Sequence, residues 1–94
     1  MKGTHIIDEC NRVSIPYAMR GPINWEIGDK LTALVDQKTK TITLFKNKEG
    51  DLEIDSFSRI TLSEACIIEL GWSRSDELAL SLDEKNKTIT LSLS

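Results

Sequence analysis

Histidine, cysteine, proline and aromatic residues are scarce in this sequence of 94 residues, which contains one histidine, two cysteines, two prolines and 5% aromatic residues. The lone histidine, His5, and the two cysteines, Cys10 and Cys66, show none of the paired spacings from which zinc sites are built. The scattered serines form no pattern with a base that would activate a nucleophile. The sequence therefore predicts neither a metal site nor a cofactor, and we expect no enzymatic activity.

A long hydrophobic run is also missing. No apolar stretch approaches the roughly 18 residues that span a bilayer, and the N-terminus leads into Ile6 and Ile7 without the apolar core of a signal segment. We therefore expect a cytoplasmic protein that does not associate with membranes. A disulfide is disfavoured in that reducing compartment, so Cys10 and Cys66 are interpreted as free thiols, buried or half-buried.

The most informative feature of the sequence is an internal repeat. Sliding the sequence against itself by 47 residues aligns residues 5–47 with residues 52–94 without a gap, and 14 of the 43 pairs are identical. One identical pair is Trp25 with Trp72, and we expect these two side chains to fill equivalent places in the core. Two copies are too few for an open solenoid, which needs about three or more repeats. They suit a closed unit with two-fold pseudosymmetry, like a dimer fused into one chain.

Each copy shows the same ββαββ order of elements. Short alternations of apolar and polar residues indicate strands, and clusters of Asp, Asn, Lys and Gly between them indicate turns. The predicted strands lie at residues 4–7, 13–15, 31–35 and 41–45 of the first copy and at residues 52–54, 60–62, 78–82 and 88–93 of the second. A polar turn precedes each second strand, and a helix follows it.

The helices of the two copies are expected to differ. In the second copy Ser63 can cap the helix, apolar residues follow it, and Gly71 ends it. In the first copy Pro16 opens the helix, but the step from Gly21 to Pro22 ends it early. We therefore expect the first helix to be about one turn long or distorted.

A single copy, with two hairpins and a short helix, cannot enclose a core by itself. We therefore predict one domain over residues 1–94, in which repeats 5–47 and 52–94, joined by a linker at 48–51, share a core. The predicted fold class is mostly β with short helices (α+β). Its architecture is a β-barrel with a pseudo-two-fold axis, because closure removes exposed strand edges.

These features resemble the AbrB/SpoVT family of bacterial regulators. The likeness lies in a D-x-x-x-R turn, a short apolar strand ending in an Ile-Pro step, an arginine beyond the proline and a Gly-Asp turn before a hairpin. The residues that carry it are Asp8, Arg12, Val13, Ile15, Pro16, Arg20, Gly28, Asp29 and Leu31, and in the second copy Asp55, Arg59, Ile60, Leu62, Leu70, Gly71, Asp76 and Leu78. Members of this family form swapped-hairpin barrels, and the tandem arrangement is similar to MraZ. The second copy departs from the pattern, because it lacks the Ile-Pro step.

The resemblance implies double-stranded DNA as the partner and transcription regulation as the role. The family's DNA contacts are associated with arginines of the shared motif, which correspond here to Arg12 and Arg20 in the first copy and Arg59 in the second. Asn11, in the same turn as Arg12, completes the predicted DNA-binding residues. Gly21 stands where the family often carries a further arginine.

The three arginines also allow structural interpretations. Arg12 and Arg59 each follow an aspartate by four residues, so each can pair with that aspartate across its turn. Arg20 has no acidic residue four places before it, and we expect it to face outward. A guanidinium that remains accessible can bind both phosphates and base edges.

Charge divides unevenly between the two copies, within a net charge of −3. Residues 1–47 carry seven lysines and arginines against five acidic residues, whereas residues 48–94 carry five against ten. The first copy is therefore better suited to meet phosphate, and we expect a homo-oligomer that brings several basic edges together. The acidic second copy supports an alternative, a protein-interaction or antitoxin-type module that has kept the barrel without binding DNA.

Overall fold

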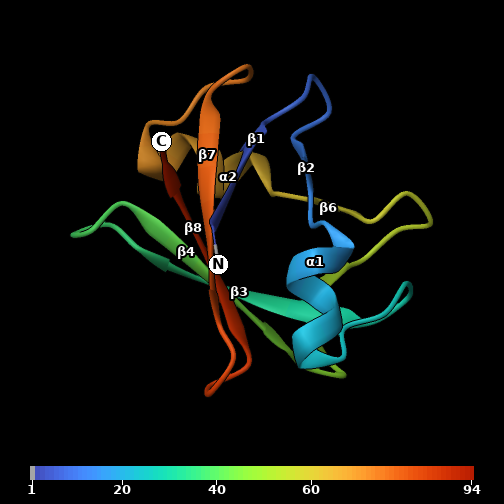
Figure 1. The fold of residues 1–94 in the computed structure, drawn as a ribbon. Coiled ribbons are helices and arrows are strands. Elements are labelled where there is room, and N and C mark those ends of the chain that lie inside the picture. Colours follow the sequence, from blue (N-terminus) through green and yellow to red (C-terminus); the bar gives the residue numbers. More distant parts are fainter. Residues whose placement is uncertain (1) are drawn as a thin grey trace.

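The computed structural model describes the backbone of residues 2–94 and the side chains from residue 5 onward. The first repeat contributes β1 (Lys2–Ile6), β2 (Arg12–Ser14), α1 (Tyr17–Arg20), the 3-10 helix η1 (Gly21–Ile23), β3 (Lys30–Asp36) and β4 (Thr41–Lys46). The second contributes β5 (Leu52–Glu53), β6 (Arg59–Thr61), α2 (Glu64–Leu70), β7 (Glu77–Asp83) and β8 (Thr88–Leu93). The chain is mostly β with two short helices, and its larger sheet curls into a barrel-like fold (Figure 1).

The strands of the two repeats pair with one another. One antiparallel sheet has the order β1-β7-β8-β4-β3-β5, and β2 and β6 form a separate two-stranded ribbon. The first strand of each repeat therefore pairs with the third strand of the other, β1 with β7 and β5 with β3. Neither half completes its own sheet, because each needs a strand from the other half.

The register of these pairs relates the two repeats by a local two-fold axis. Val13 lies opposite Ile60 in the ribbon, and Thr43 lies opposite Thr90 in the large sheet. Both pairs are separated by the repeat offset of 47 residues, so each joins equivalent positions. Residues with positive φ also fall into pairs 47 apart, namely Asn11 with Ser58, Asn24 with Gly71, Gly28 with Ser75 and Lys40 with Lys87.

The core is formed by apolar residues of both repeats. Alternate residues of the long strands point into it, including Leu31 and Ile42 of one half and Leu78 and Ile89 of the other, all 0% exposed. Trp25 and Trp72 are 2% and 4% exposed, which confirms that both belong to the core. The β2–β6 ribbon closes one side of this core, because Val13 and Ile60 are also 0% exposed and belong to the same cluster.

The predicted contrast between the helices is confirmed. Helix α2 is seven residues long, the Ser63 hydroxyl accepts a hydrogen bond from the Cys66 N–H at 3.1 Å, and Gly71 ends the helix at φ 70°. Helix α1 has four residues and continues into η1, which ends at Asn24 with φ 58°. Gly21 and Pro22 therefore shorten α1. Both helical segments still end at a residue with left-handed backbone, Asn24 in the first repeat and Gly71 in the second.

Several sequence predictions needed correction, beginning with the bounds of the strands, which differ from the expected ones by up to two residues at an end. The second strands begin one residue earlier than expected, at Arg12 and Arg59. Their last predicted residues, Ile15 and Leu62, lie just beyond the strands but keep the same pairing, because the Ile15 N–H donates to the Ser58 carbonyl at 2.7 Å and the Leu62 N–H donates to the Asn11 carbonyl at 2.8 Å. The prediction that Cys10 is buried or half-buried is wrong, because it lies exposed at the tip of a polar turn, whereas Cys66 is half-buried.

Candidate functional site

The turn before β2 is organised by one carboxylate. Oδ1 of Asp8 accepts hydrogen bonds from the backbone N–H groups of Cys10 and Arg12, at 2.9 and 2.8 Å. Oδ2 of Asp8 accepts a hydrogen bond from Nε of Arg12 at 2.7 Å. A charge-assisted contact of this length orients the guanidinium plane, so Asp8 both closes the turn and holds Arg12.

The turn before β6 repeats this arrangement. Oδ1 of Asp55 accepts hydrogen bonds from the backbone N–H groups of Phe57 and Arg59, at 2.8 and 2.9 Å, and Oδ2 accepts from Nε of Arg59 at 3.2 Å. The prediction that each arginine pairs with the aspartate four residues before it is therefore confirmed in both copies.

The two arginines lie on the outer face of the β2–β6 ribbon. Because Val13 and Ile60 point into the core, the residues on either side of them in the strands point outward. Arg12 and Arg59 stand at diagonally opposite corners of the ribbon, and a strand rise and spacing of about 3.3 and 4.8 Å place their Cα atoms about 8 Å apart. The two turns lie at opposite ends of the antiparallel ribbon, the first at the top of Figure 1 and the second at its right edge.

The terminal nitrogens of both guanidinium groups remain available. Each side chain uses Nε for its aspartate, and neither Nη1 nor Nη2 of Arg12 or Arg59 forms a hydrogen bond with the side chains described from residue 5 onward or with the described backbone. The side chains are 34% and 25% exposed. The result is a pair of two-fold-related donors, held by carboxylates and directed away from the core.

An aromatic side chain extends this surface on the second copy. Phe57 is 72% exposed at the tip of its turn, and its ring lies 4.8 Å from Cζ of Arg59. Cys10 occupies the equivalent place in the first copy and is also exposed. The two repeats therefore present equivalent arginines on the outer surface of the ribbon, but their turn tips differ, with Cys10 in the first and Phe57 in the second.

The prediction that Arg20 faces outward is wrong. Arg20 is 7% exposed. Its Nε and Nη1 donate to the carbonyl oxygens of Ile15 and Trp25 at 2.9 and 3.2 Å, and its Nη2 donates to Oγ of Ser58 at 2.9 Å. Two backbone carbonyls of the first repeat and the Ser58 hydroxyl of the second therefore take the place of an acidic partner. Through Ser58, Arg20 holds α1 against the turn before β6.

Asn11 is also buried, at 8% exposure, so it does not present its amide on the surface as the predicted DNA contact requires. Its Nδ2 donates to Oε2 of Glu64 at 2.8 Å, and Nη2 of Arg74 donates to the same oxygen at 3.1 Å. The turn of the first copy is thereby joined to the start of α2. Oδ1 of Asn11 is buried without a hydrogen-bond partner among the described residues.

Acidic groups surround the candidate site. The charged residues of the two turns and of the adjoining start of α2 are Asp8, Glu9, Arg12, Asp55, Arg59 and Glu64, and Arg74 joins them through its ion pair with Glu64. The four carboxylates exceed the three arginines by one, so the surface as a whole does not attract polyanions strongly. Any affinity for nucleic acid must come from directed contacts by the two ribbon arginines.

The two turn aspartates give stability a defined pH dependence. Hydrogen bonds from the backbone N–H of Arg12 and of Arg59 are the main cause that lowers the pKa of Asp8 and of Asp55, respectively, below 3.8. A lowered folded-state pKa stabilises the protein above 3.8, and this contribution is lost as the pH falls through the folded-state values. We expect the free energy of unfolding to decline below about pH 4.

Urea unfolding at a series of pH values, followed by tryptophan fluorescence, checks this prediction. The double variant Asp8→Asn/Asp55→Asn keeps an acceptor oxygen in each turn but cannot titrate. It should therefore show a flatter decline below pH 4 than the parent protein. An identical decline in both proteins would show that other carboxylates are responsible.

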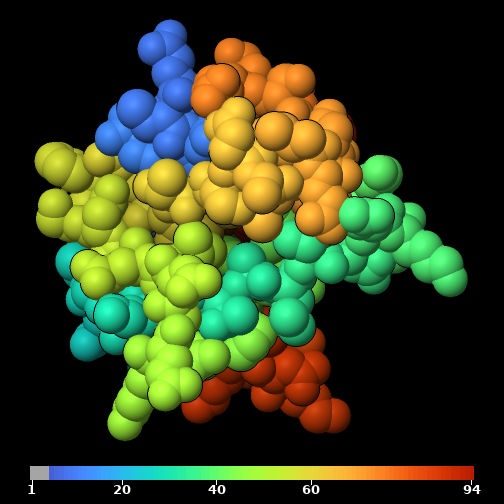
Figure 2. Space-filling model, turned by 180° about the vertical axis from the view of Figure 1, so that it is seen from behind, coloured from blue at the N-terminus to red at the C-terminus, as the bar shows by residue number. Residues whose placement is uncertain are grey.

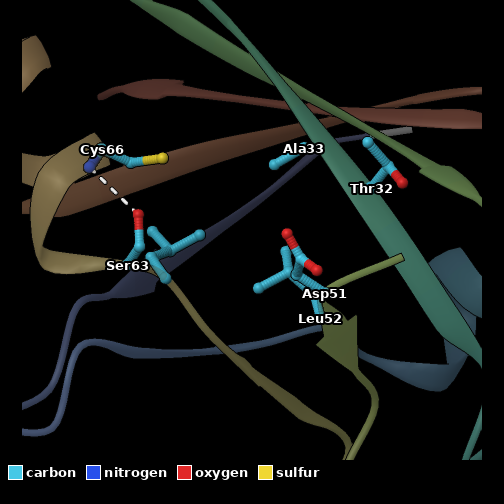
Figure 3. A pocket seen from close by; sticks show the side chains of 7 residues that line it. Thr32, Ala33, Asp51, Leu52, Ser63 and Cys66 are labelled. Atoms are coloured by element: carbon cyan, nitrogen blue, oxygen red, sulfur yellow. Dashed lines mark hydrogen bonds between the residues drawn. The ribbon is translucent and has the colours of Figure 1, made fainter. Parts of the chain in front are cut away.

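A small hollow lies on the opposite face of the molecule. It has a volume of about 140 Å³ and is lined by Thr32, Ala33, Asp51, Leu52, Leu62, Ser63 and Cys66. Figure 2 shows this face, where β3, the start of β5 and the start of α2 surround the hollow. In Figure 3 the Cys66 sulfur points across it toward Ala33, and the Ser63 hydroxyl points back to the helix that it caps. Apolar side chains make up more than half of the lining, and Asp51 supplies its one carboxylate.

Neither metal-binding clusters nor membrane spans are found in the described chain. Among residues 2–94 no three His, Cys, Asp or Glu side chains gather into a group that could hold a metal ion. None of the helices in that range is long and apolar enough to cross a membrane.

Comparisons with known proteins provide a likeness of fold. No protein-family model matches the chain, and no curated protein matches it. The solution structure of PHS018 from Pyrococcus horikoshii is similar, with a TM-score of 0.54 over 99% of this chain and 87% of that one. The sequence identity is 14%, so the likeness concerns the arrangement of the backbone alone.

Proposed function

We propose that this protein is an AbrB-like DNA-binding transcription regulator built as a swapped-hairpin barrel, in which the β2–β6 ribbon meets the DNA. The exchange of first strands between the two repeats supports the proposed fold family. The outward-facing arginine pair supports the proposed activity. In this proposal the protein acts by binding, and no catalytic step is involved.

The arginine pair on the ribbon is the observation that carries the proposal. A two-stranded β-ribbon fits the major groove, where arginine can donate two hydrogen bonds to O6 and N7 of guanine. Asp8 and Asp55 hold Arg12 and Arg59 through Nε and leave the two Nη groups available, which is the donor pair that such a contact uses. The local two-fold axis would then relate two similar contacts on the two DNA strands.

The acidic surroundings predict modest affinity for a single chain. Only two arginines reach out from the ribbon, and Asp8 and Asp55 offset their charge, so few counterions are released on binding. Useful affinity at physiological salt then requires several chains on one DNA, which is consistent with the proposed homo-oligomer. Asp8 and Asp55 also repel DNA phosphates. This repulsion is offset only where the arginines form hydrogen bonds with matching bases, so the carboxylates favour specific over nonspecific sites.

Fluorescence anisotropy with labelled duplex DNA tests the proposal. Because the target is unknown, duplexes are first enriched from a random pool at low salt, and the tightest are titrated. Replacing Arg12 or Arg59 by alanine should weaken binding to the selected duplex by about tenfold each, since one base contact contributes about 1–3 kcal/mol. Arg74→Ala is the matched control, because Arg74 is also an exposed, carboxylate-paired arginine but lies outside the ribbon.

The proposal fails if no duplex is enriched, or if Arg74→Ala weakens binding as much as the ribbon variants do. Thermal unfolding of each variant separates loss of contact from loss of fold. The ribbon variants should unfold close to the parent temperature, because half-exposed ion pairs contribute little to stability.

Protein interaction is the second candidate function, and Phe57 is the observation that favours it. An aromatic ring that is 72% exposed and stacked on an arginine is a common centre of protein–protein binding energy. In that case Phe57→Ala should abolish capture of a protein partner, while no duplex is enriched. DNA binding that survives Phe57→Ala and is lost in Arg59→Ala would favour the first function instead.

A further inference from the structure

A group of four lysines, Lys30, Lys46, Lys48 and Lys87, lines two hollows away from the ribbon. A first hollow of about 410 Å³ is lined by Gly28, Asp29, Lys30, Lys46 and Lys48. A second hollow of about 360 Å³ is lined by Ile23, Asn24, Trp25, Phe45, Lys46, Asn86 and Lys87. Lys46 borders both hollows, so they form one surface, here called the lysine groove, with four lysines and one aspartate.

Lys46 is fixed between the two hollows. Its Nζ donates to the carbonyl oxygen of Asn24 at 2.9 Å and to Oδ2 of Asp29 at 3.0 Å. An ammonium group has three donors, so one N–H remains for a ligand. Lys30, Lys48 and Lys87 are exposed around it, and among the described residues none of these three forms an ion pair.

The two hollows differ in character. The first is bordered by three lysines, whereas the second has an apolar floor formed by Ile23 and Trp25, with half-buried Phe45 beside it. Asn24 and Asn86 supply amide groups at the edge of the second hollow and are exposed. An anionic group fits the first hollow, and a flat, partly polar group fits the second.

The second repeat lacks this combination at the equivalent place. Across the offset of 47 residues, Lys30 corresponds to Glu77, Phe45 to Ser92, Lys46 to Leu93 and Asn24 to Gly71. The backbone geometry is shared, since Asn24 and Gly71 both have positive φ. The same backbone geometry forms at both places, so Lys30, Lys46 and Phe45 are not required by it, whereas Lys87 corresponds to another lysine, Lys40.

We propose that the lysine groove binds a nucleoside phosphate. The phosphates lie in the first hollow against Lys30, Lys46 and Lys48, where compact ammonium groups bind them as point charges. The base lies in the second hollow beside Phe45, and the amides of Asn24 and Asn86 meet its polar edge. The combined size of the hollows falls in the range of small-molecule sites, about 300–1,000 Å³. The same chemistry recognises a free nucleotide or a nucleotide of a single strand.

Isothermal titration calorimetry with the full chain tests this proposal. Adenosine diphosphate and uridine diphosphate are the probes, with adenosine and inorganic pyrophosphate as partial ligands. We expect at least one diphosphate to bind saturably and at least tenfold more tightly than either partial ligand. Lys30→Glu, which installs the residue of the second repeat, should weaken that binding by at least tenfold. Lys85→Ala, a lysine that does not line the groove, should leave it unchanged.

Lys48→Ala keeps the test decisive if Lys30→Glu does not fold, because Lys48 is exposed and makes no ion pair among the described residues. A single-stranded oligonucleotide is titrated as well. If it binds more tightly than the diphosphates and Lys48→Ala weakens this binding, the groove binds nucleotides of a single strand through the same contacts. Absence of saturable binding, equal binding of pyrophosphate alone, or unchanged affinity in the lysine variants would overturn the proposal. Arg12→Ala should bind the diphosphate normally, so this test is independent of the ribbon's DNA binding.

Discussion

Replacement of Arg20 by methionine is expected to lower the free energy of unfolding by about 3 kcal/mol, within the range for breaking a buried charged hydrogen-bond network. Methionine keeps much of the side-chain volume but donates no hydrogen bond. The carbonyl oxygens of Ile15 and Trp25 and the hydroxyl of Ser58 would lose their partner in a site where Arg20 itself is 7% exposed. Urea unfolding followed by tryptophan fluorescence measures the change.

Two further variants make the Arg20 prediction specific. Arg20→Lys should not restore stability, because one ammonium group cannot reproduce the planar donors that reach three acceptors. Ile67→Met changes the equivalent position of the second repeat, which is 5% exposed, and should lower stability by less than about 1.5 kcal/mol. Parent-like stability of Arg20→Met, together with loss of DNA binding, would show that Arg20 acts in recognition.

Replacement of Gly50 by alanine should destabilise the protein by about 3 kcal/mol or more, as expected when backbone must move to relieve a clash. A Cβ at Gly50 would lie 2.1 Å from the carbonyl oxygen of Leu31 and 2.4 Å from its carbonyl carbon, so no side-chain rotation can relieve the contact. The linker cannot move away freely, because the Asn47 N–H donates to the Lys30 carbonyl and Asn47 Nδ2 donates to Oγ1 of Thr32.

Gly71→Ala is the matched control for Gly50→Ala. Gly71 has φ 70°, but a Cβ there meets nothing within 4 Å. The control should cost only about 1 kcal/mol, the strain of a left-handed alanine. Size-exclusion chromatography accompanies the unfolding experiment, since a displaced linker can release the strand exchange and yield a swapped dimer. Similar stability of the two alanine variants would show that the linker does not depend on its contact with β3.

Much of the fold follows from the repeat in the sequence. Identical spacing in both copies predicts equivalent turns, and the structure places Asp8 with Arg12 and Asp55 with Arg59 in the same contacts. These contacts span four residues, so local chemistry determines them. The cap at Ser63 could also be predicted, because its hydrogen bond reaches only to Cys66.

Long-range partners could not be predicted in this way. Arg20 has no acidic neighbour in sequence, and its Ser58 partner lies 38 residues away in the other repeat. Asn11 is occupied by Glu64, 53 residues away. Only the pairing of the two repeats brings Arg20 to Ser58 and Asn11 to Glu64. The spacing of residues along the chain therefore could not predict that Arg20 and Asn11 are buried. The lysine groove could not be predicted for the same reason, since its residues come from four separate segments.

The proposed function rests on the claim that Arg12 and Arg59 contact duplex DNA from the outer face of the β2–β6 ribbon. Nuclear magnetic resonance of ¹⁵N-labelled protein, titrated with the enriched duplex, tests it most directly. We expect the Nε–H signals of Arg12 and Arg59 and the amide signals of residues 8–14 and 55–61 to shift together, while the Nε–H signal of Arg20 stays in place. Saturable binding that shifts signals elsewhere and leaves both ribbon arginines unchanged would contradict it.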